Sequence, residues 1–375
     1  MKIVIFGLSI SSAWGNGHAT LLRGLFRALH SSGHQVHFFE RDTPYYAAHR
    51  DALQLPYVHL HLYSDWLAVR QQAKKLLSDA DVGMVTSYCA DGRAACELLL
   101  DSGVPRCLFY DMDTPVTLSR LDKGERVEYL PEQGLADFDL VLSYTGGKAL
   151  EQLRSKLGAR RAAALYGWVD PQIHRRTAPT PEFSADLSYL GTYSADRQET
   201  LERMLIEPAR VLGSNAFVIA GAMYPNTQEW PANIRHFGHV VPSQHSVFYS
   251  SSPVTLNVTR GAMAAMGYCP SGRLFEAAAC GTAVLSDWWT GLDAFFEPGR
   301  EILVANSTEE SIREIAKDRS LLENIGARAR ERALDCHTAA IRAARLLSLI
   351  ERPRDESGEC ELMRRRPKEL KVCGV

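Results

Sequence analysis

The sequence has no long hydrophobic run and no large excess of either charge. No apolar stretch reaches the roughly 20 residues that a membrane helix needs, so we expect no integral membrane segment. The formal net charge is -2. Nucleic-acid-binding proteins usually carry a basic face, and this balance predicts no such partner. One basic run, Arg364–Arg366, lies near the C-terminus. It is either a solvated tail or a contact with a membrane surface or an acidic partner.

The sequence also lacks closely spaced pairs of cysteines. The eight cysteines are scattered, and no two of them form a Cys-x-x-Cys pair. This pattern indicates neither a disulfide framework nor a zinc site. We therefore expect reduced cysteines in a cytoplasmic protein, with no metal ion and no other cofactor. The apolar run at residues 3–7 is too short for a secretory signal and is typical of a buried first strand.

What the sequence does contain is a long alternation of strand-like and helix-like segments. Short apolar or β-branched runs predict strands at 2–6, 34–40, 82–86, 106–110 and 140–143, and then at 187–190, 216–220, 234–237, 254–258, 283–286 and 302–304. Segments with helical periodicity separate most of them. Such alternation predicts the α/β class, with doubly wound parallel sheets.

The length of the chain allows two such domains. A polar, proline-rich stretch at 177–181 interrupts the alternation, and we place the domain boundary just before it. This gives an N-terminal domain over 1–168 and a C-terminal domain over 169–350, whose last helix can cross back to the first domain. Residues 351–375 are charged and are expected to be disordered. Open α/β sheets bind ligands at the carboxyl ends of their strands, so a crevice between the domains is the expected site.

The first candidate group follows the first strand. Gly15, Asn16, Gly17 and His18 stand between this strand and a predicted helix. Glycines let the backbone approach a ligand, and a helix N-terminus favours an anion. His18 is either a helix-capping residue or a base facing the crevice. The dinucleotide-binding pattern Gly-x-Gly-x-x-Gly is absent.

A second group follows the strand at 106–110. Asp111 and Asp113 stand two residues apart before Thr114-Pro115. Two carboxylates there can bind sugar hydroxyls or accept a proton. Turn formation is an equally good interpretation, and no second element suggests a metal site.

Two further groups lie in the C-terminal half. Gly191 and Thr192 follow a strand and, with Arg197 in the next helix, form a possible anion cradle; Arg197 is otherwise a solvated first-turn residue. Ser271, Gly272 and Arg273 begin a helix that carries Glu276 among Leu, Phe and Ala. A carboxylate in such surroundings needs hydrogen-bond donors, which are either ribose hydroxyls or backbone amides. Trp288 and Trp289 are interpreted as a base-stacking pair or as core.

The stretch Arg273–Gly281, with Ser286–Trp288 and Phe296–Gly299, resembles the C-terminal domain of the CgeB-like (spore maturation protein-like) glycosyltransferases. Gly15–Thr20 and Asp111–Pro115 are similar to the N-terminal half of that family. The resemblance covers about residues 1–350 and implies the GT-B fold, two Rossmann-like domains facing an interdomain cleft. It also implies transfer of a sugar from a nucleotide-sugar donor to a glycan, small-molecule or protein acceptor, without a metal ion.

The wider GT-B group, family 4 in particular, suggests individual roles. By that resemblance Glu276 binds the donor ribose, and Arg197 neutralises the donor diphosphate with help from Arg273. His18, Asp113 and Asp111 are the catalytic candidates on the acceptor side. The sequence departs from family 4 at Tyr268 and Glu202, where that family has Glu and Lys, which leaves the stereochemistry open. A nucleotide-sugar 2-epimerase and a non-catalytic sugar- or nucleotide-binding protein remain alternatives. The sugar, the nucleotide, the acceptor and the oligomeric state are not indicated.

Overall fold

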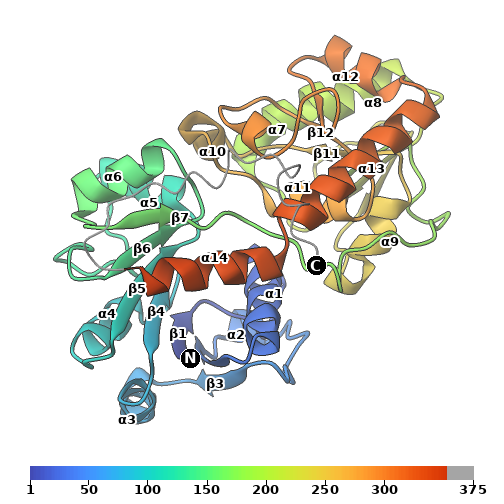
Figure 1. Cartoon of the computed structure of the whole chain (residues 1–375). Helices are drawn as coiled ribbons and strands as arrows, with labels where there is room; N and C mark the ends of the chain where they lie inside the picture. The colour runs from blue at the N-terminus through green and yellow to red at the C-terminus, as the bar shows by residue number, and fades with distance from the viewer. Residues whose placement is uncertain (353–375) are drawn as a thin grey trace, which may run out of the picture.

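The computed structural model describes residues 1–352, which form two parallel sheets flanked by helices (Figure 1). The predicted tail, with the Arg364–Arg366 run, lies outside these residues apart from its first two positions. The predicted α/β class and two-sheet architecture are confirmed. None of the helices in residues 1–352 has both the length and the apolar character needed to cross a bilayer.

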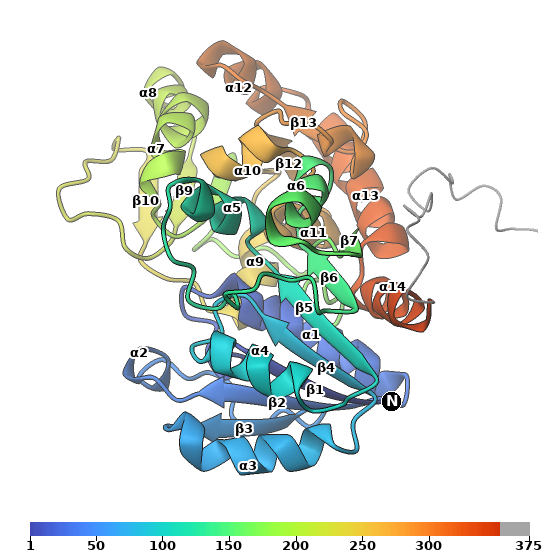
Figure 2. The same cartoon turned by 90° about the vertical axis from the view of Figure 1, so that its left-hand side faces the viewer.

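The N-terminal lobe has a seven-stranded sheet in which all pairs are parallel. In spatial order its strands are β3 (His59–Tyr63), β2 (Gln35–Arg41), β1 (Lys2–Gly7), β4 (Val82–Thr86), β5 (Arg106–Asp111), β6 (Leu140–Ser143) and β7 (Ala162–Ala164). Its helices are α1 (Gly17–Ser31), α2 (Pro44–Ala47), α3 (Trp66–Leu77), α4 (Gly92–Leu100), α5 (Thr114–Asp122) and α6 (Lys148–Leu157). Figure 2 shows α3 and β3 at the edge farthest from the C-terminal lobe.

The C-terminal lobe has a six-stranded parallel sheet. Its spatial order is β10 (Ile234–Phe237), β9 (Phe217–Ala220), β8 (Leu187–Leu190), β11 (Val254–Asn257), β12 (Ala283–Ser286) and β13 (Leu303–Val304). Its helices are α7 (Ala195–Leu201), α8 (Glu207–Val211), α9 (His245–Ser250), α10 (Gly261–Met266), α11 (Gly272–Ala279), α12 (Thr308–Ile315) and α13 (Arg319–Cys336). Short helical turns occur at Glu202–Ile206, Pro242–Gln244 and Leu292–Ala294.

Both faces of each sheet are covered, and the strand sequences show why. In β1, Ile3 and Ile5 join the core on one face, whereas Val4 and Phe6 join the core on the other. Phe217 and Val218 divide in the same way in β9. A strand that is buried on both faces is apolar throughout, rather than alternating between apolar and polar. These runs were therefore recognisable as strands in the sequence.

One helix boundary differs from the sequence-based expectation. The pattern of residues 195–207 predicts a helix that ends before Pro208. Instead, a widened π turn at Glu202–Ile206 leads directly into α8, in which Pro208 lies in the first turn. Proline has no N–H to leave unpaired at such an irregular position, so the helical path continues.

The chain crosses between the lobes twice, and the two crossings pair with each other. Val169, on the way out, donates its N–H to the carbonyl of His337 at 2.9 Å, and its carbonyl accepts from the N–H of Ala339 at 2.8 Å on the way back. The last helix, α14 (Ala339–Glu351), then packs against α1 of the N-terminal lobe (Figure 1). The buried guanidinium of Arg342 donates to the carbonyls of Tyr166 and Gly167 and holds this junction together.

Candidate functional site

A cleft with a cavity volume of about 600 Å³ lies between the lobes. It receives the loops at the carboxyl ends of β1, β4, β5, β8, β9, β10 and β11, as expected for open parallel sheets. Nearly all the residues selected from the sequence line it: Gly15, Asn16, Gly17, His18 and Asp113 from one lobe, and Gly191, Thr192, Arg197, Ser271, Gly272, Arg273 and Glu276 from the other. Asp111 does not line it.

The loop after β1 is held rigid by a residue that the sequence analysis missed. Glu40, fully buried at the end of β2, accepts hydrogen bonds from the backbone N–H groups of Ile10 and Ser11 at 2.7 and 3.0 Å. It also accepts from the hydroxyl of Ser9 at 2.7 Å. A buried carboxylate is tolerated when donors surround it. The signal in the sequence was a lone Glu ending an apolar strand, together with hydroxyl residues after the neighbouring strand.

Asn16 then starts α1 and positions His18. Its side-chain oxygen accepts from the backbone N–H of His18 at 3.1 Å, and its amide donates to the carbonyl of Ser9 at 3.0 Å. Gly15 has a φ of +60°, which a residue with a side chain adopts only at a cost. The loop therefore presents His18 at a fixed place in the cleft.

His18 and Asp113 come together although they lie far apart in the sequence. His18 Nε2 is 2.8 Å from Asp113 Oδ2. Within residues 1–352, the hydrogen bond of the Asp113 carboxylate is the one between Oδ2 and His18, and His18 Nδ1 is buried without a partner. The ring of Tyr88 lies 5.9 Å from that of His18, and its backbone has an unusual φ of +61°. Strained backbone is concentrated at functional sites.

The structure places Asp111 beneath this pair. Its side chain is fully buried, and Oδ1 accepts from the N–H of Asp113 at 3.0 Å. The side chain of Thr117 also lies close enough to lower the pKa of this carboxyl. Burial raises the pKa of Asp111 to about 7. Its place under the loop supports Asp113 and keeps its carboxyl away from any molecule in the cleft.

Three arginines surround the opposite end of the cleft. Arg273 is tied down: its Nη1 donates to Asn257 at 3.0 Å, and its Nε donates to the carbonyl of Leu190. Arg197 donates to the carbonyl of Thr192, and its Nε has no partner within residues 1–352. Burial lowers the pKa of Arg197. Clustered cations of this kind favour an anionic ligand.

The third arginine, Arg260, was not selected from the sequence. It follows β11, lines the cleft and makes an ion pair with Asp196, with Nε 3.3 Å from Oδ2. Both side chains are more than a third exposed. Exposed ion pairs of this kind contribute little free energy, so the guanidinium of Arg260 can turn toward an anion.

Glu276 faces the cleft from α11. Ser271 caps this helix by accepting from the N–H of Arg273 at 3.3 Å. The side chain of Glu276 is 15% exposed. Within residues 1–352 its carboxylate has one hydrogen bond, from the hydroxyl of Tyr249 at 3.4 Å. Glu276 is thus neither turned to bulk solvent nor saturated by backbone amides, and it retains capacity to accept hydrogen bonds.

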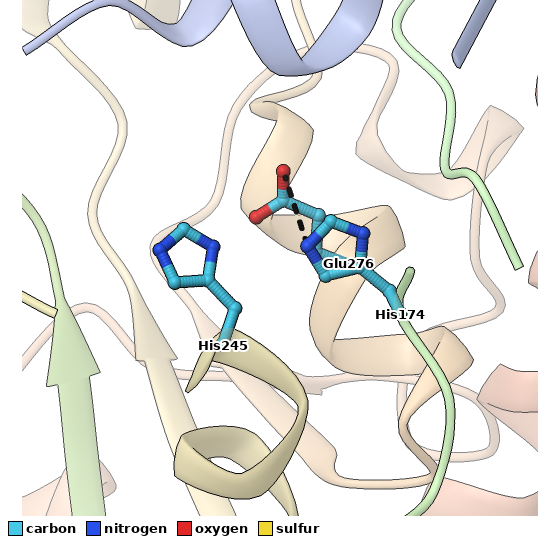
Figure 3. Close-up of side chains that lie close together, drawn as sticks. All are labelled: His174, His245 and Glu276. Atoms are coloured by element: carbon cyan, nitrogen blue, oxygen red, sulfur yellow. Dashed lines mark ion pairs between the residues drawn. The ribbon is translucent and has the colours of Figure 1, made fainter. Parts of the chain in front are cut away.

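Two histidines, the buried His174 and the half-buried His245, lie beside Glu276 (Figure 3). His174 Nε2 is 3.9 Å from Glu276 Oε1. One atom from each of His174, His245 and Glu276 lies within 4.8 Å of the other two. Burial lowers the pKa of His174 and lowers that of His245 to about 4, so both rings are neutral near pH 7. The sequence analysis missed this cluster because no short spacing connects its members.

Two aromatic features complete the description. Trp14 stacks on His49 of its own lobe and contacts His239 of the other lobe, with both ring centroids 4.3 Å away. Trp288 and Trp289, interpreted above as a base-stacking pair or as core, do not line the cleft: Trp289 is buried and Trp288 is exposed. Trp289 packs near Phe295, which favours the core interpretation for this residue.

Comparisons with known proteins agree with this arrangement. Residues 197–348 match the model of a family described as glycosyl transferase-like. A search of curated proteins finds no match. Among solved structures, sucrose-phosphate synthase from Thermosynechococcus elongatus is similar with a TM-score of 0.64 at 16% identity, covering 93% of this chain and 98% of that one. The fold is that of the GT-B glycosyltransferases.

Other GT-B structures agree equally well. HepE from Anabaena, in complex with UDP and glucose, has a TM-score of 0.63 at 12% identity, covering 93% of this chain and 98% of that one. An alpha-glucosyltransferase in complex with UDP and DNA has a TM-score of 0.63 at 14% identity, covering 94% of this chain and 99% of that one. The interdomain cleft of this chain thus occurs in a GT-B fold with a glycosyl transferase-like segment in its second half.

Proposed function

We propose that this protein is a glycosyltransferase of the CgeB-like group that moves a sugar from a nucleotide-sugar donor to an acceptor. The observation that carries the proposal is the cleft itself, which brings a carboxylate with free accepting capacity, Glu276, opposite the His18–Asp113 pair. The solved GT-B structures with bound UDP and glucose or UDP-glucose support a uridine diphosphate sugar as the first donor to test. The buried free cysteines support action in the cytoplasm.

The C-terminal lobe binds the donor in this proposal. Glu276 accepts hydrogen bonds from the ribose hydroxyls, because an ionised carboxylate can only accept and its other neighbours supply few donors. The diphosphate lies near Gly191, Thr192 and the start of α11 at Ser271 and Gly272, where backbone N–H groups favour an anion. Close backbone approach from the Gly15–Gly17 loop completes this cradle.

The arginines supply the charge that the departing diphosphate requires. Arg197 and Arg260 provide guanidinium donors, and Arg273 adds its charge while it fixes the ends of β8 and β11. Preorganised donors of this kind stabilise developing negative charge without a bound cation. We propose that the transfer needs no metal ion and no other cofactor.

The N-terminal lobe binds the acceptor. Asp113 lines the cleft and keeps Oδ1 free, while Oδ2 is held by His18. In an inverting transfer Asp113 takes the proton of the attacking hydroxyl, and His18 fixes the carboxylate in position. Asp111 acts only through the loop, since its carboxyl is buried beneath Asp113.

Donor binding tests the proposal directly. UDP-, GDP-, dTDP- and CMP-sugars are added to the full chain in a thermal-shift assay, and hits are measured by calorimetry. One donor class is expected to raise the Tm by mass action, and Glu276→Ala is expected to abolish that shift. Glu199→Ala is the control, because that carboxylate is 93% exposed and belongs to the same lobe. Absence of a shift with every donor would contradict the proposal. Epimerisation of the donor without any acceptor would indicate the 2-epimerase alternative.

A further inference from the structure

We propose that His174, His245 and Glu276 form a binding site for a divalent transition metal ion of the Zn²⁺ class on the donor side of the cleft. This inference extends the proposed function, because the ion and the donor share the carboxylate of Glu276. The ion is a competitor of the donor in this proposal and takes no part in sugar transfer.

The first argument is the set of ring nitrogens without partners. His174 is 1% exposed, and within residues 1–352 neither of its ring nitrogens has a hydrogen bond. His245 Nδ1 is likewise buried without a partner. A buried polar atom left unpaired typically costs about 1–3 kcal/mol. One nitrogen of each ring lies close to the carboxylate of Glu276, and a group that accepts electron pairs would give both nitrogens a partner.

The second argument is the tautomer of His245. Its Nε2 lies 3.2 Å from the carbonyl of Val240. A carbonyl only accepts, so Nε2 carries the proton and Nδ1 presents its lone pair. A ligating histidine usually donates its other N–H to a carbonyl or carboxylate in this manner. Val240 therefore fixes the ring in the form that binds a metal ion.

The third argument is geometry and ligand type. Zn²⁺ lies about 2.0–2.2 Å from histidine nitrogens and carboxylate oxygens, which in its tetrahedral geometry places two ligand atoms about 3.3–3.6 Å apart. His174 Nε2 and Glu276 Oε1 are 3.9 Å apart, a few tenths of an ångström beyond this spacing. The three atoms together lie within 4.8 Å, so ion binding requires the side chains to draw slightly closer. Two imidazoles with one carboxylate suit Zn²⁺ and its neighbours, whereas Mg²⁺ and Ca²⁺ prefer oxygen ligands.

A metal ion can also contact more of the side chains in this cluster than the two hydroxyls of a ribose can. Ribose hydroxyls in the cleft reach Glu276 and His245, which both line it. They leave His174 unpaired, because that ring is almost completely buried and does not line the cavity. An ion held by all three residues gives the Nε2 atom of His174 a partner as well. Its remaining position faces the cleft and holds water.

Direct binding is measured on the full chain without a histidine tag, after treatment with a chelator. Calorimetry with ZnCl₂ and absorbance with CoCl₂ are expected to show one ion per chain with nitrogen and oxygen ligands. His245→Ala and His174→Asn are expected to weaken this binding by more than the roughly 10- to 100-fold that loss of an outer-shell partner costs. His239→Ala is the control, since this histidine lines the cleft outside the cluster.

Unchanged Zn²⁺ affinity in both His245→Ala and His174→Asn would overturn the proposal, as would the absence of Zn²⁺ binding to the native chain. Circular dichroism and the Tm of each variant confirm that it is folded. If one histidine variant fails to fold, the other still decides the outcome.

Competition distinguishes this inference from the proposed function. Saturating Zn²⁺ is expected to raise the Kd of the donor at least tenfold in the native chain and to leave it unchanged in His174→Asn. By linkage, the donor must weaken Zn²⁺ by the same factor. A donor Kd that is insensitive to Zn²⁺ would refute competition. If no donor binds while Zn²⁺ still binds through the two histidines, the proposed function fails and the metal site stands.

Discussion

A substitution at Asp113 separates the proposed proton-accepting role of the cleft from its proposed donor-binding role. Asp113→Asn keeps the size of the side chain and the contact with His18, but an amide cannot accept a proton. We expect kcat to fall about 10²- to 10⁴-fold, while donor affinity changes little because Glu276 and the arginines belong to the other lobe. Initial rates and donor calorimetry measure the two quantities separately. A kcat within threefold of the native value would show that Asp113 is not the base.

A second prediction concerns Asp111 and the free energy of unfolding. The pKa of its carboxyl is about 7 in the folded protein against 3.8 ordinarily. Between about pH 4 and pH 7 the folded state therefore holds a proton that the unfolded state has released. The stability due to this group is complete below pH 4 and is lost as the pH rises through 7.

Asp111→Asn removes this titration. We expect the free energy of unfolding of the variant to fall less than that of the native chain between pH 4.5 and pH 7.5, as measured by urea denaturation at both values. Asp101→Asn, on an exposed residue at the end of α4, is the control and is expected to follow the native chain. Parallel curves for Asp111→Asn and the native chain would count against a protonated Asp111.

The residues of the site were predictable where they follow directly from a strand or begin a helix. His18, Asp113 and Gly191 were chosen because the carboxyl ends of parallel strands meet at one edge. Glu276 was chosen because a carboxylate among apolar neighbours needs hydrogen-bond donors. Glu40, Arg260, His174 and His245 were not predicted, because their roles arise from partners brought close only by folding. Asp111 shows the opposite failure, because nothing in the pattern of residues indicates that it is buried while Asp113 is not.

At the scale of the elements, α14 links the end of the described chain to the first helix. Leu346 is 1% exposed and belongs to the core that α14 shares with α1 and β1. Leu346→Ala is expected to lower the free energy of unfolding by about 2–5 kcal/mol, through lost burial and a residual cavity. Leu321→Ala is the control, because that side chain is 44% exposed and such changes usually stay within about 0.5 kcal/mol. If urea denaturation shows that both substitutions lower the free energy of unfolding equally, α14 does not support the N-terminal lobe.

Strands that are buried on both faces were the easiest elements to predict from the sequence. Strands β1, β4, β5 and β12 are apolar on both faces, so their sequences resemble no other element of that length. The edge strand β3 was missed because it is half exposed and carries two histidines. Helix α5 was missed because Asp113-Thr114-Pro115 was interpreted as a turn, although a proline in the first helical turn is equally compatible with a helix start.

At the scale of the whole molecule, the ring of Trp14 is one of the contacts that join the two lobes beside the cleft. Trp14→Ala removes its packing on His239 and favours a more open arrangement. An aromatic pair contributes about 0.5–1.5 kcal/mol, so the Kd of the donor is expected to rise about 2- to 10-fold. Small-angle scattering of the variant is expected to show a larger radius of gyration.

Trp288→Ala is the matched control, since this tryptophan is 46% exposed and lies outside the cleft. Donor affinity and scattering that do not differ between the two tryptophan variants would exclude a bridging role for Trp14.

The doubled crossing at Val169 has a consequence for how the lobes approach each other. A single covalent strand swivels about its own axis, whereas two strands joined by backbone hydrogen bonds resist torsion and yield chiefly to flexing. We therefore expect the lobes to open and close by bending at this junction. Such a motion would restore the position of Asp113 relative to Glu276 each time the lobes close.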